Sequence, residues 1–175
     1  MRRAFTLIEL LVVMSIIGIL SAILLPMVSG MRALGRNTRC VSNLSQLGKA
    51  ISVYADAYDQ WYPCASVLPS GEPKEGGPPR ICDLLRRYAA AAIFECPDDK
   101  PTDPQYAFRS YFLGEGSSYE WAEMFNYVKV GQPHPLMPVK LDIIPILRDY
   151  EPFHRGSSGR KGINGLFMDS RVESF

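Results

Sequence analysis

The apolar residues of the chain are concentrated in one long block near its start. Residues 5–26 form a run in which Glu9 is the single charged residue, and Arg2 and Arg3 precede the run directly. As an α-helix, a block of about 22 residues measures roughly 33 Å, close to the ~30 Å hydrocarbon core of a bilayer. The pattern therefore predicts a membrane-spanning helix. The two arginines favour a cytoplasmic N-terminus, which would leave the body of the chain exported.

Beyond Gly30 the apolar residues become periodic. They recur at alternating spacings of four and three: Cys40, Leu44, Leu47, Ile51, Tyr54 and Tyr58. This spacing places them on one stripe of an α-helix. The stripe ends near Asp59, and Pro63 follows it. We therefore expect one long helix over residues 6–59, whose second half lays its apolar face on a globular domain.

The rest of the chain is rich in Pro and Gly and predicts short elements. In order, we expect a loop over 63–80, a short helix over 81–92, a brief strand and turn over 93–104, a strand over 106–114, a helix or strand over 119–128, a core segment over 140–150 and a β-hairpin over 165–175. The hairpin is expected to turn at Asp169-Ser170.

Glu9 is out of place in an apolar block. A carboxylate deep in lipid costs on the order of 2.5–3.5 kcal/mol, and residues of this kind usually have a function. Glu9 lies near the predicted cytoplasmic end, where the cost is smaller, but it still needs a positive partner. An ordinary cleaved signal peptide is the alternative interpretation. The length of the apolar block and the acidic residue inside it argue against that alternative.

The segment "RAFTLIELLVVMSIIGILSAILLP" resembles the N-terminus of type IV prepilins and of the pseudopilins of type II secretion systems. The resemblance implies that a membrane prepilin peptidase cuts between Ala4 and Phe5, and that Phe5 is then N-methylated. Ala4 stands where the family usually has Gly. The resemblance also implies that Glu9 pairs with the N-terminal amine of a neighbouring subunit during assembly, and that Pro26 marks a kink in the helix.

The same resemblance implies an α+β, pilin-like fold, in which a long N-terminal helix packs on a small antiparallel β-sheet domain. The expected segments are a leader peptide (1–4), a transmembrane and filament-core helix (5–28), an amphipathic continuation of the helix (29–60) and a globular domain (61–175). The expected location is the inner (cytoplasmic) membrane, with a single span and a periplasmic or extracellular globular domain.

Three functions fit these features. Our first hypothesis is a structural subunit of a type II secretion pseudopilus, with prepilin peptidase and other pilin or pseudopilin subunits as partners. The second is a type IV pilin, including a minor one. The third is a single-span surface-anchored binding module that never polymerises. A cluster of aromatic residues would form either the ligand surface of such a module or part of the hydrophobic core. Its members are Tyr106, Phe108, Tyr111, Phe112, Tyr119, Trp121 and Phe125.

The body of the chain shows a second, looser resemblance, to pilin-like proteins of planctomycetes and related bacteria. It is carried by "RCVSNLSQLGKAISVYADAYDQWYP", "FECPDD" and the end "FHRGSSGRKGINGLFMDSRVESF". The matching residues of that end are His154, Asn164, Leu166, Phe167, Asp169 and Val172. Ser170 and Arg171 depart from the Gly-His of the family.

Charge and cysteine content narrow the possible partners and cross-links. The net charge of +1 gives no sign of a nucleic-acid-binding surface. The four cysteines are Cys40, Cys64, Cys82 and Cys96, and none belongs to a C-x-x-C pair, which argues against a zinc site. In an exported domain they could form disulfides, with Cys40–Cys96 or Cys64–Cys82 as candidate pairs.

Candidate chemistry is sparse, and we expect neither an enzyme nor a bound metal or cofactor. His154 could pair with Asp149 or Asp169, but no nucleophile motif accompanies the pair. The chain has two histidines, too few for a His-based metal site. The segment "ECPDDKPTD" gathers four carboxylates: Glu95, Asp98, Asp99 and Asp103. We interpret it as a solvated acidic turn, with a Ca²⁺ loop as the alternative.

Overall fold

The computed structural model describes residues 6–66, 76–100, 110–136, 140–155 and 161–175. The chain divides into two compact units, residues 1–35 and residues 36–175.

One α-helix, α1 (Leu7–Ala57), accounts for the first third of the chain. In the second unit, α1 buries most of the predicted stripe, and Cys40, Leu44 and Leu47 are fully enclosed, whereas Tyr58 lies beyond the end of the helix and is exposed. Gly48 lies so close to the sheet that an added Cβ would stand 3.0 Å from Leu166 Cδ1. The helix ends where Asp59 and Gln60 take positive φ values of 52° and 64°. The predicted long helix is therefore confirmed.

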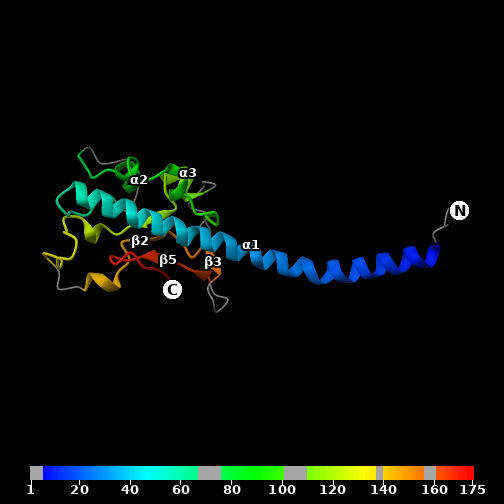
Figure 1. Cartoon of the computed structure of the whole chain (residues 1–175). Coiled ribbons are helices and arrows are strands. Elements are labelled where there is room, and N and C mark those ends of the chain that lie inside the picture. The colour runs from blue at the N-terminus through cyan, green and yellow to red at the C-terminus, as the bar shows by residue number, and fades with distance from the viewer. Residues whose placement is uncertain (1–5, 67–75, 101–109, 137–139, 156–160) are drawn as a thin grey trace. The chain divides into compact units, whose positions relative to one another are not determined.

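A four-stranded antiparallel sheet forms the β part of the fold (Figure 1). Its strand order is β1-β2-β5-β6, where the strands are β1 (Tyr119–Trp121), β2 (Leu147–Asp149), β5 (Asn164–Leu166) and β6 (Val172–Ser174). A separate ribbon pairs β3 (His154–Arg155) with β4 (Lys161–Gly162). The arrangement of a long helix and a small antiparallel sheet is α+β and pilin-like, as predicted.

The C-terminal β-hairpin is also confirmed. Leu166 pairs with Val172, and Asn164 pairs with Ser174. The chain reverses through Ser170, whose φ of 65° is unusual for a residue other than Gly, Asn or Asp. The turn is closed by the Phe167 N–H, which donates to the Arg171 carbonyl over 2.9 Å. Ser170 therefore adopts the left-handed conformation that Gly adopts more readily.

Short helical turns lie between α1 and β1 and between β1 and β2. They are α2 (Ile81–Leu85), η1 (Ala91–Phe94), α3 (Tyr111–Glu115), η2 (Glu123–Phe125) and η3 (Leu141–Ile143). The strand expected over 106–114 is wrong where the structure describes it, because residues 111–115 are helical. The Ser110 hydroxyl accepts a bond from the Leu113 N–H, and Gly116 ends the turn with a φ of 80°. These two caps outweigh the β-propensity of the aromatic side chains.

Candidate functional site

The N-terminal part of α1 presents apolar side chains all round. Every Leu, Ile, Val and Met between residues 7 and 25 is between 48% and 83% exposed. A helix that is apolar on all faces needs lipid or other helices around it. Within the described chain, α1 is the one helix long and apolar enough to cross a membrane. This segment is the first candidate site.

Glu9 closes a hydrogen-bonded cap at the start of α1. Its carboxylate oxygen Oε2 accepts bonds from the Thr6 N–H (2.9 Å) and from the Thr6 hydroxyl (2.7 Å). The pattern T-L-I-E is a capping box, with Thr6 as the N-cap residue and Glu9 three positions on. Within the single chain, these donors partly offset the cost of placing the carboxylate in an apolar block. The four-residue pattern is visible in the sequence, and a search for capping boxes would have found this contact.

The structure describes the other residues of the predicted processing site only in part. Ala4 and Phe5, the predicted cleavage and methylation positions, lie outside the described residues. Helix α1 continues through Pro26, so this proline does not end the helix. The kink at Pro26 stays a prediction, as does the pairing of Glu9 with a neighbouring subunit.

A buried polar cluster in the second unit is the other candidate site. At its centre lies His154, which is 3% exposed. Its Nδ1 stands 3.1 Å from Asp98 Oδ2, and Asp98 also pairs with Arg36 of α1. Because the carboxylate accepts a hydrogen bond at Nδ1, we assign the ring proton to Nδ1. The lone pair of Nε2 then faces the interior of the cluster.

Asp149 lies on the other side of His154. Its Oδ2 stands 3.5 Å from His154 Nε2 and accepts a 2.7 Å bond from the Asn164 N–H. Burial raises the pKa of Asp149 to about 7, and the nearby Asp99 and Asp98 carboxylates add to the rise. Burial lowers the pKa of His154, against the pull of Asp98. Both groups are therefore shifted toward their neutral forms.

The disulfide Cys40–Cys96 borders the cluster and joins α1 to the segment after η1. Of the two candidate pairs, this one is formed, and the pair Cys64–Cys82 is not. Cys82 is a buried free thiol and Cys64 a partly buried one. The Cys96 Sγ lies 3.3 Å from His154 Nε2. A helix, a turn and a strand thus meet at this point.

The acidic segment is not a solvated turn, and that prediction is wrong. Asp99 is buried, and its carboxylate accepts bonds from the N–H groups of Tyr111 (3.0 Å) and Phe112 (2.8 Å) and from the Ser118 hydroxyl (2.6 Å). Asp99 thus orients the first turn of α3, and Asp98 orients His154. Glu95 is exposed, while Asp103 lies outside the described residues. The alternative, a Ca²⁺ loop at this segment, stays untested.

Residues of the second resemblance contribute to the same interior. Asn164 Nδ2 donates to Asn37 Oδ1 over 2.9 Å, and Asn164 Oδ1 accepts from the Ser174 hydroxyl. Asn164 therefore ties the sheet to α1. Leu166 and Phe167 are buried in the core, whereas Asp169 is exposed. Of the two partners considered for His154, Asp149 is the neighbour, and Asp169 lies nearest to Arg171. Nothing in the sequence spacing pointed to Arg36 or Asn37.

The aromatic cluster belongs mainly to the core. Tyr111, Tyr119, Trp121 and Phe125 are buried, and Phe112 packs against the core. Tyr106 and Phe108 lie outside the described residues. The buried members therefore supply no ligand surface.

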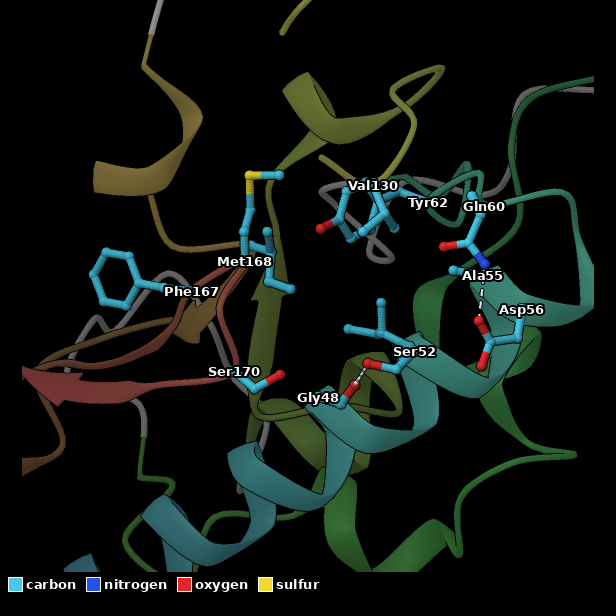
Figure 2. A pocket seen from close by; sticks show the side chains of 12 residues that line it. Gly48, Ser52, Ala55, Asp56, Gln60, Tyr62, Val130, Phe167, Met168 and Ser170 are labelled. Carbon is cyan, nitrogen blue, oxygen red and sulfur yellow. Dashed lines mark hydrogen bonds between the residues drawn. The ribbon is translucent and has the colours of Figure 1, made fainter. Parts of the chain in front are cut away.

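A small pocket lies between α1 and the turn of the C-terminal hairpin (Figure 2). Gly48, Ser52 and Gln60 line it from one side, and Met168 and Ser170 from the other. Its volume of about 70 Å³ is well below the roughly 300–1,000 Å³ of typical ligand sites. Its polar groups are partly engaged, since the Ser52 hydroxyl donates to the Gly48 carbonyl and Gln60 donates to Asp56. The pocket is too small for a drug-sized ligand.

The fold and the N-terminal segment define a pilin-like α+β protein with one helix able to cross a membrane. Residues 1–25 match the family model described as the prokaryotic N-terminal methylation motif. The match supports a type IV prepilin-like protein. No curated protein and no solved structure matches the chain. The match ends at residue 25, so it does not test the resemblance of the body to planctomycete pilin-like proteins.

Proposed function

We propose that the protein is a structural subunit of a membrane-rooted filament. The observation that carries the proposal is the apolar surface of α1 between Leu7 and Leu25, exposed on all sides and preceded by the Thr6–Glu9 cap. A single chain does not cover this surface. Lipid covers it in the membrane, and the helices of other subunits cover it in a filament. The methylation motif over residues 1–25 supports the same interpretation.

The proposed processing follows the motif. A prepilin peptidase cuts between Ala4 and Phe5, and the new amine at Phe5 is methylated. In the filament the amine of one subunit meets Glu9 of its neighbour. Because the attraction between opposite charges is stronger in a low-dielectric environment, the pair sets the register between subunits. Assembly then exchanges the contacts of Glu9 with Thr6 for an ionic contact between chains.

The proposed location is the inner membrane, with a cytoplasmic N-terminus and an exported globular domain. Arg2 and Arg3 support the orientation by the positive-inside rule. The Cys40–Cys96 disulfide supports export, because structural disulfides persist mainly in oxidising compartments. Among filament machines we propose the pseudopilus of a type II secretion system, with a type IV pilus as the alternative. The features above are common to both machines.

Replacing Glu9 tests this function directly. Glu9→Ala should still insert into the membrane, because it makes the block more apolar, but it should no longer enter filaments. Cross-linking in native membranes followed by sedimentation measures the assembly. Thr6→Ala is the matched control, since it removes the hydroxyl partner of Glu9 and keeps the carboxylate. Normal filaments from Glu9→Ala would contradict the proposal and favour a surface-anchored module that does not polymerise.

The choice of machine needs a second readout. Deletion of the gene should stop the export of folded proteins across the outer membrane if the subunit belongs to a secretion pseudopilus. Normal secretion with a loss of surface fibres would instead assign it to a type IV pilus.

A further inference from the structure

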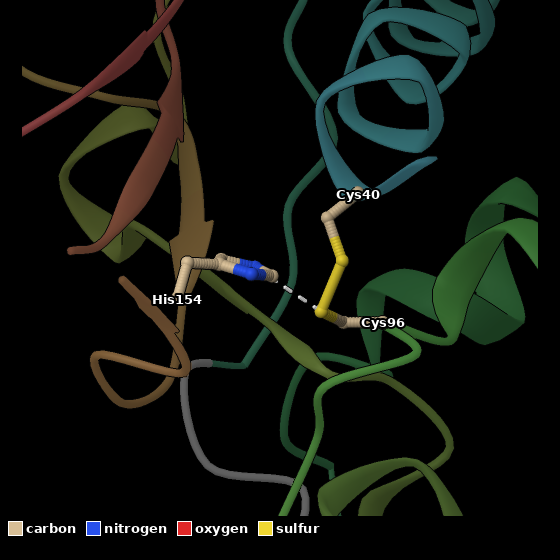
Figure 3. A group of neighbouring side chains, drawn as sticks. All are labelled: Cys40, Cys96 and His154. Carbon is tan, nitrogen blue, oxygen red and sulfur yellow. Dashed lines mark hydrogen bonds between the residues drawn. A yellow bond between two sulfur atoms is a disulfide. The ribbon is translucent and has the colours of Figure 1, made fainter. Parts of the chain in front are cut away.

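Three side chains with metal-binding atoms meet in the core of the second unit (Figure 3). They are Cys40 from α1, Cys96 from the turn after η1 and His154 from β3, and all three are buried. One donor atom from each lies within 4.8 Å of the other two. Disulfide formation by itself needs only the two cysteines. The approach of His154 Nε2 to 3.3 Å from the Cys96 Sγ therefore calls for a separate explanation.

The orientation of His154 is that of a metal-binding histidine. Metal-ligating histidines usually donate their other ring N–H to a carboxylate, which fixes the tautomer and the ring plane. Asp98 provides this carboxylate at 3.1 Å from Nδ1, and Arg36 in turn holds Asp98. The lone pair of Nε2 is left facing the sulfur atoms.

Asp149 lies beside these three donors, next to His154. It is 0% exposed, and among the described residues its Oδ1 has no hydrogen-bond partner. Its Oδ2 stands 3.5 Å from His154 Nε2. A buried carboxylate oxygen without a partner is costly, and a cation would satisfy it.

Two of the donor spacings are close to those expected around a tetrahedral zinc ion. With Zn–S near 2.3 Å and Zn–N or Zn–O near 2.0–2.2 Å, a tetrahedron places S and N about 3.6 Å apart and N and O about 3.4 Å apart. The corresponding distances here are 3.3 Å (Cys96 Sγ to His154 Nε2) and 3.5 Å (His154 Nε2 to Asp149 Oδ2). For an ion to bind all four donors, the two sulfur atoms, bonded to each other in the disulfide, would have to separate to about 3.8 Å, and the Asp149 carboxylate would have to move toward them.

We propose that Cys40, Cys96, His154 and Asp149 bind Zn²⁺ when the two cysteines are reduced. Each thiol then loses one proton, and the two thiolates, the neutral imidazole and the carboxylate ligate the ion. The disulfide excludes the metal because it leaves no thiolate. The ion and the disulfide are thus alternative cross-links between the same elements, the first formed by the newly made chain and the second after oxidation by a disulfide donor.

Metal binding by the reduced full-length protein tests the proposal. The untagged protein in detergent is unfolded with a water-soluble phosphine. The phosphine takes up oxygen from water and leaves two thiols in place of the disulfide. The protein is then refolded without oxygen, with or without Co²⁺ as a spectroscopic probe. We expect one Co²⁺ per reduced chain, with the charge-transfer absorption of cobalt–thiolate bonds, and none per disulfide-bonded chain. Zn²⁺ should displace the cobalt and bleach the absorption.

Matched variants identify the ligands. Cys64→Ser/Cys82→Ser removes the other two thiols and should bind Co²⁺ like the wild-type protein. Cys40→Ser/Cys96→Ser should bind none. Asp98→Asn leaves the ligands in place and should weaken binding about 10–100-fold, because it removes the carboxylate that orients His154. Circular dichroism checks the fold of each protein before and after metal addition.

Three results would overturn the proposal. The first is equal cobalt binding by the disulfide-bonded protein. The second is a thiolate absorption that follows Cys64 and Cys82 instead of Cys40 and Cys96. The third is a reduced wild-type protein that binds no Co²⁺ or Zn²⁺, whether it folds alone or fails to fold with the metal present.

Discussion

Asp149 and His154 are adjacent ionisable side chains in a core that excludes water. Asp149 receives a hydrogen bond from the Asn164 backbone and faces the carboxylates of Asp98 and Asp99. Burial, helped by the two carboxylates, raises the folded-state pKa of Asp149 above its unfolded value in spite of the bond from Asn164, and burial lowers the pKa of His154. A group with a raised pKa favours folding below its unfolded pKa and loses that contribution as the pH rises. A histidine with a lowered pKa has the opposite effect below about pH 6.5.

Asp149→Asn removes the effect of Asp149 on the pH dependence of stability and keeps His154 in place. The substitution removes the titrating carboxyl and keeps an oxygen that can accept from the Asn164 N–H. Because the pKa of Asp149 is about 7 in the folded protein, the variant should gain stability relative to the wild type as the pH rises from 4 to 7. The relative gain should be about 3 kcal/mol. Urea unfolding of the disulfide-bonded proteins at pH 4 and pH 7 measures it, and a gain that shrinks with pH would be contrary to this account.

The Cys40–Cys96 disulfide should contribute strongly to the stability of the second unit. It closes a loop with a sequence separation of 56 residues. By chain entropy such a loop stabilises the folded state by about 4 kcal/mol. Cys40→Ala/Cys96→Ala should therefore lower the free energy of unfolding by roughly 2–5 kcal/mol. Cys64→Ser, at a free thiol that is not fully buried, is the control, and an equal loss in both proteins would contradict the assignment of the bond.

At the scale of single residues, the sequence predicted the chemistry of Glu9 better than its contacts. The composition of the block showed that the carboxylate needs a partner. The capping box shows that Thr6 meets part of that need within one chain. The acidic segment was misinterpreted because two consecutive aspartates normally face water. Asp99 is buried because three donors, far along the chain from it, converge on its carboxylate.

Helix α1 has two halves with different roles, and sequence periodicity separated them. Apolar residues on all faces predicted the exposed part, and the alternation of three and four predicted the part that packs on the sheet. Both patterns can be recognised in the sequence because α1 is long and each half contributes many apolar residues. Short elements carry weaker patterns, so two caps were enough to make residues 111–115 helical although their side chains favour a strand.

The buried stripe of α1 should determine the stability of the second unit. Leu47 is fully enclosed in the core, whereas Leu34 is 67% exposed. Leu47→Ala should lower the free energy of unfolding by roughly 2–5 kcal/mol, through lost burial and the cavity left behind. Leu34→Ala has the same change in chemistry and should stay within about 0.5 kcal/mol of the wild type. Thermal or urea unfolding in detergent compares them, and similar losses would contradict the assignment of the stripe to the core.

On the scale of the whole molecule, the sequence predicted the fold class, the long helix and the C-terminal hairpin. Of the buried cluster it suggested only the pairing of His154 with Asp149, as one of two alternatives, and not the cluster as a whole. Arg36, Asp98, Asp149 and His154 are separated by up to 118 positions along the chain, and only the packing of α1 against the turns and strands brings them together. Contacts of this kind leave no local period in the sequence. The processing site, in contrast, could be predicted from the sequence, because its motif is one short continuous segment.

The intact mass of the protein from its native membrane tests the central claim most directly. The account predicts a chain that has lost Met1 to Ala4 and gained one methyl group, since the match to the methylation motif covers residues 1–25. Phe5 would then carry the amine that Glu9 of a neighbouring subunit needs. A chain that keeps Met1 to Ala4 would show that the peptidase does not accept Ala4. The protein would then be a plain membrane anchor, and the proposed assembly into a filament would be wrong.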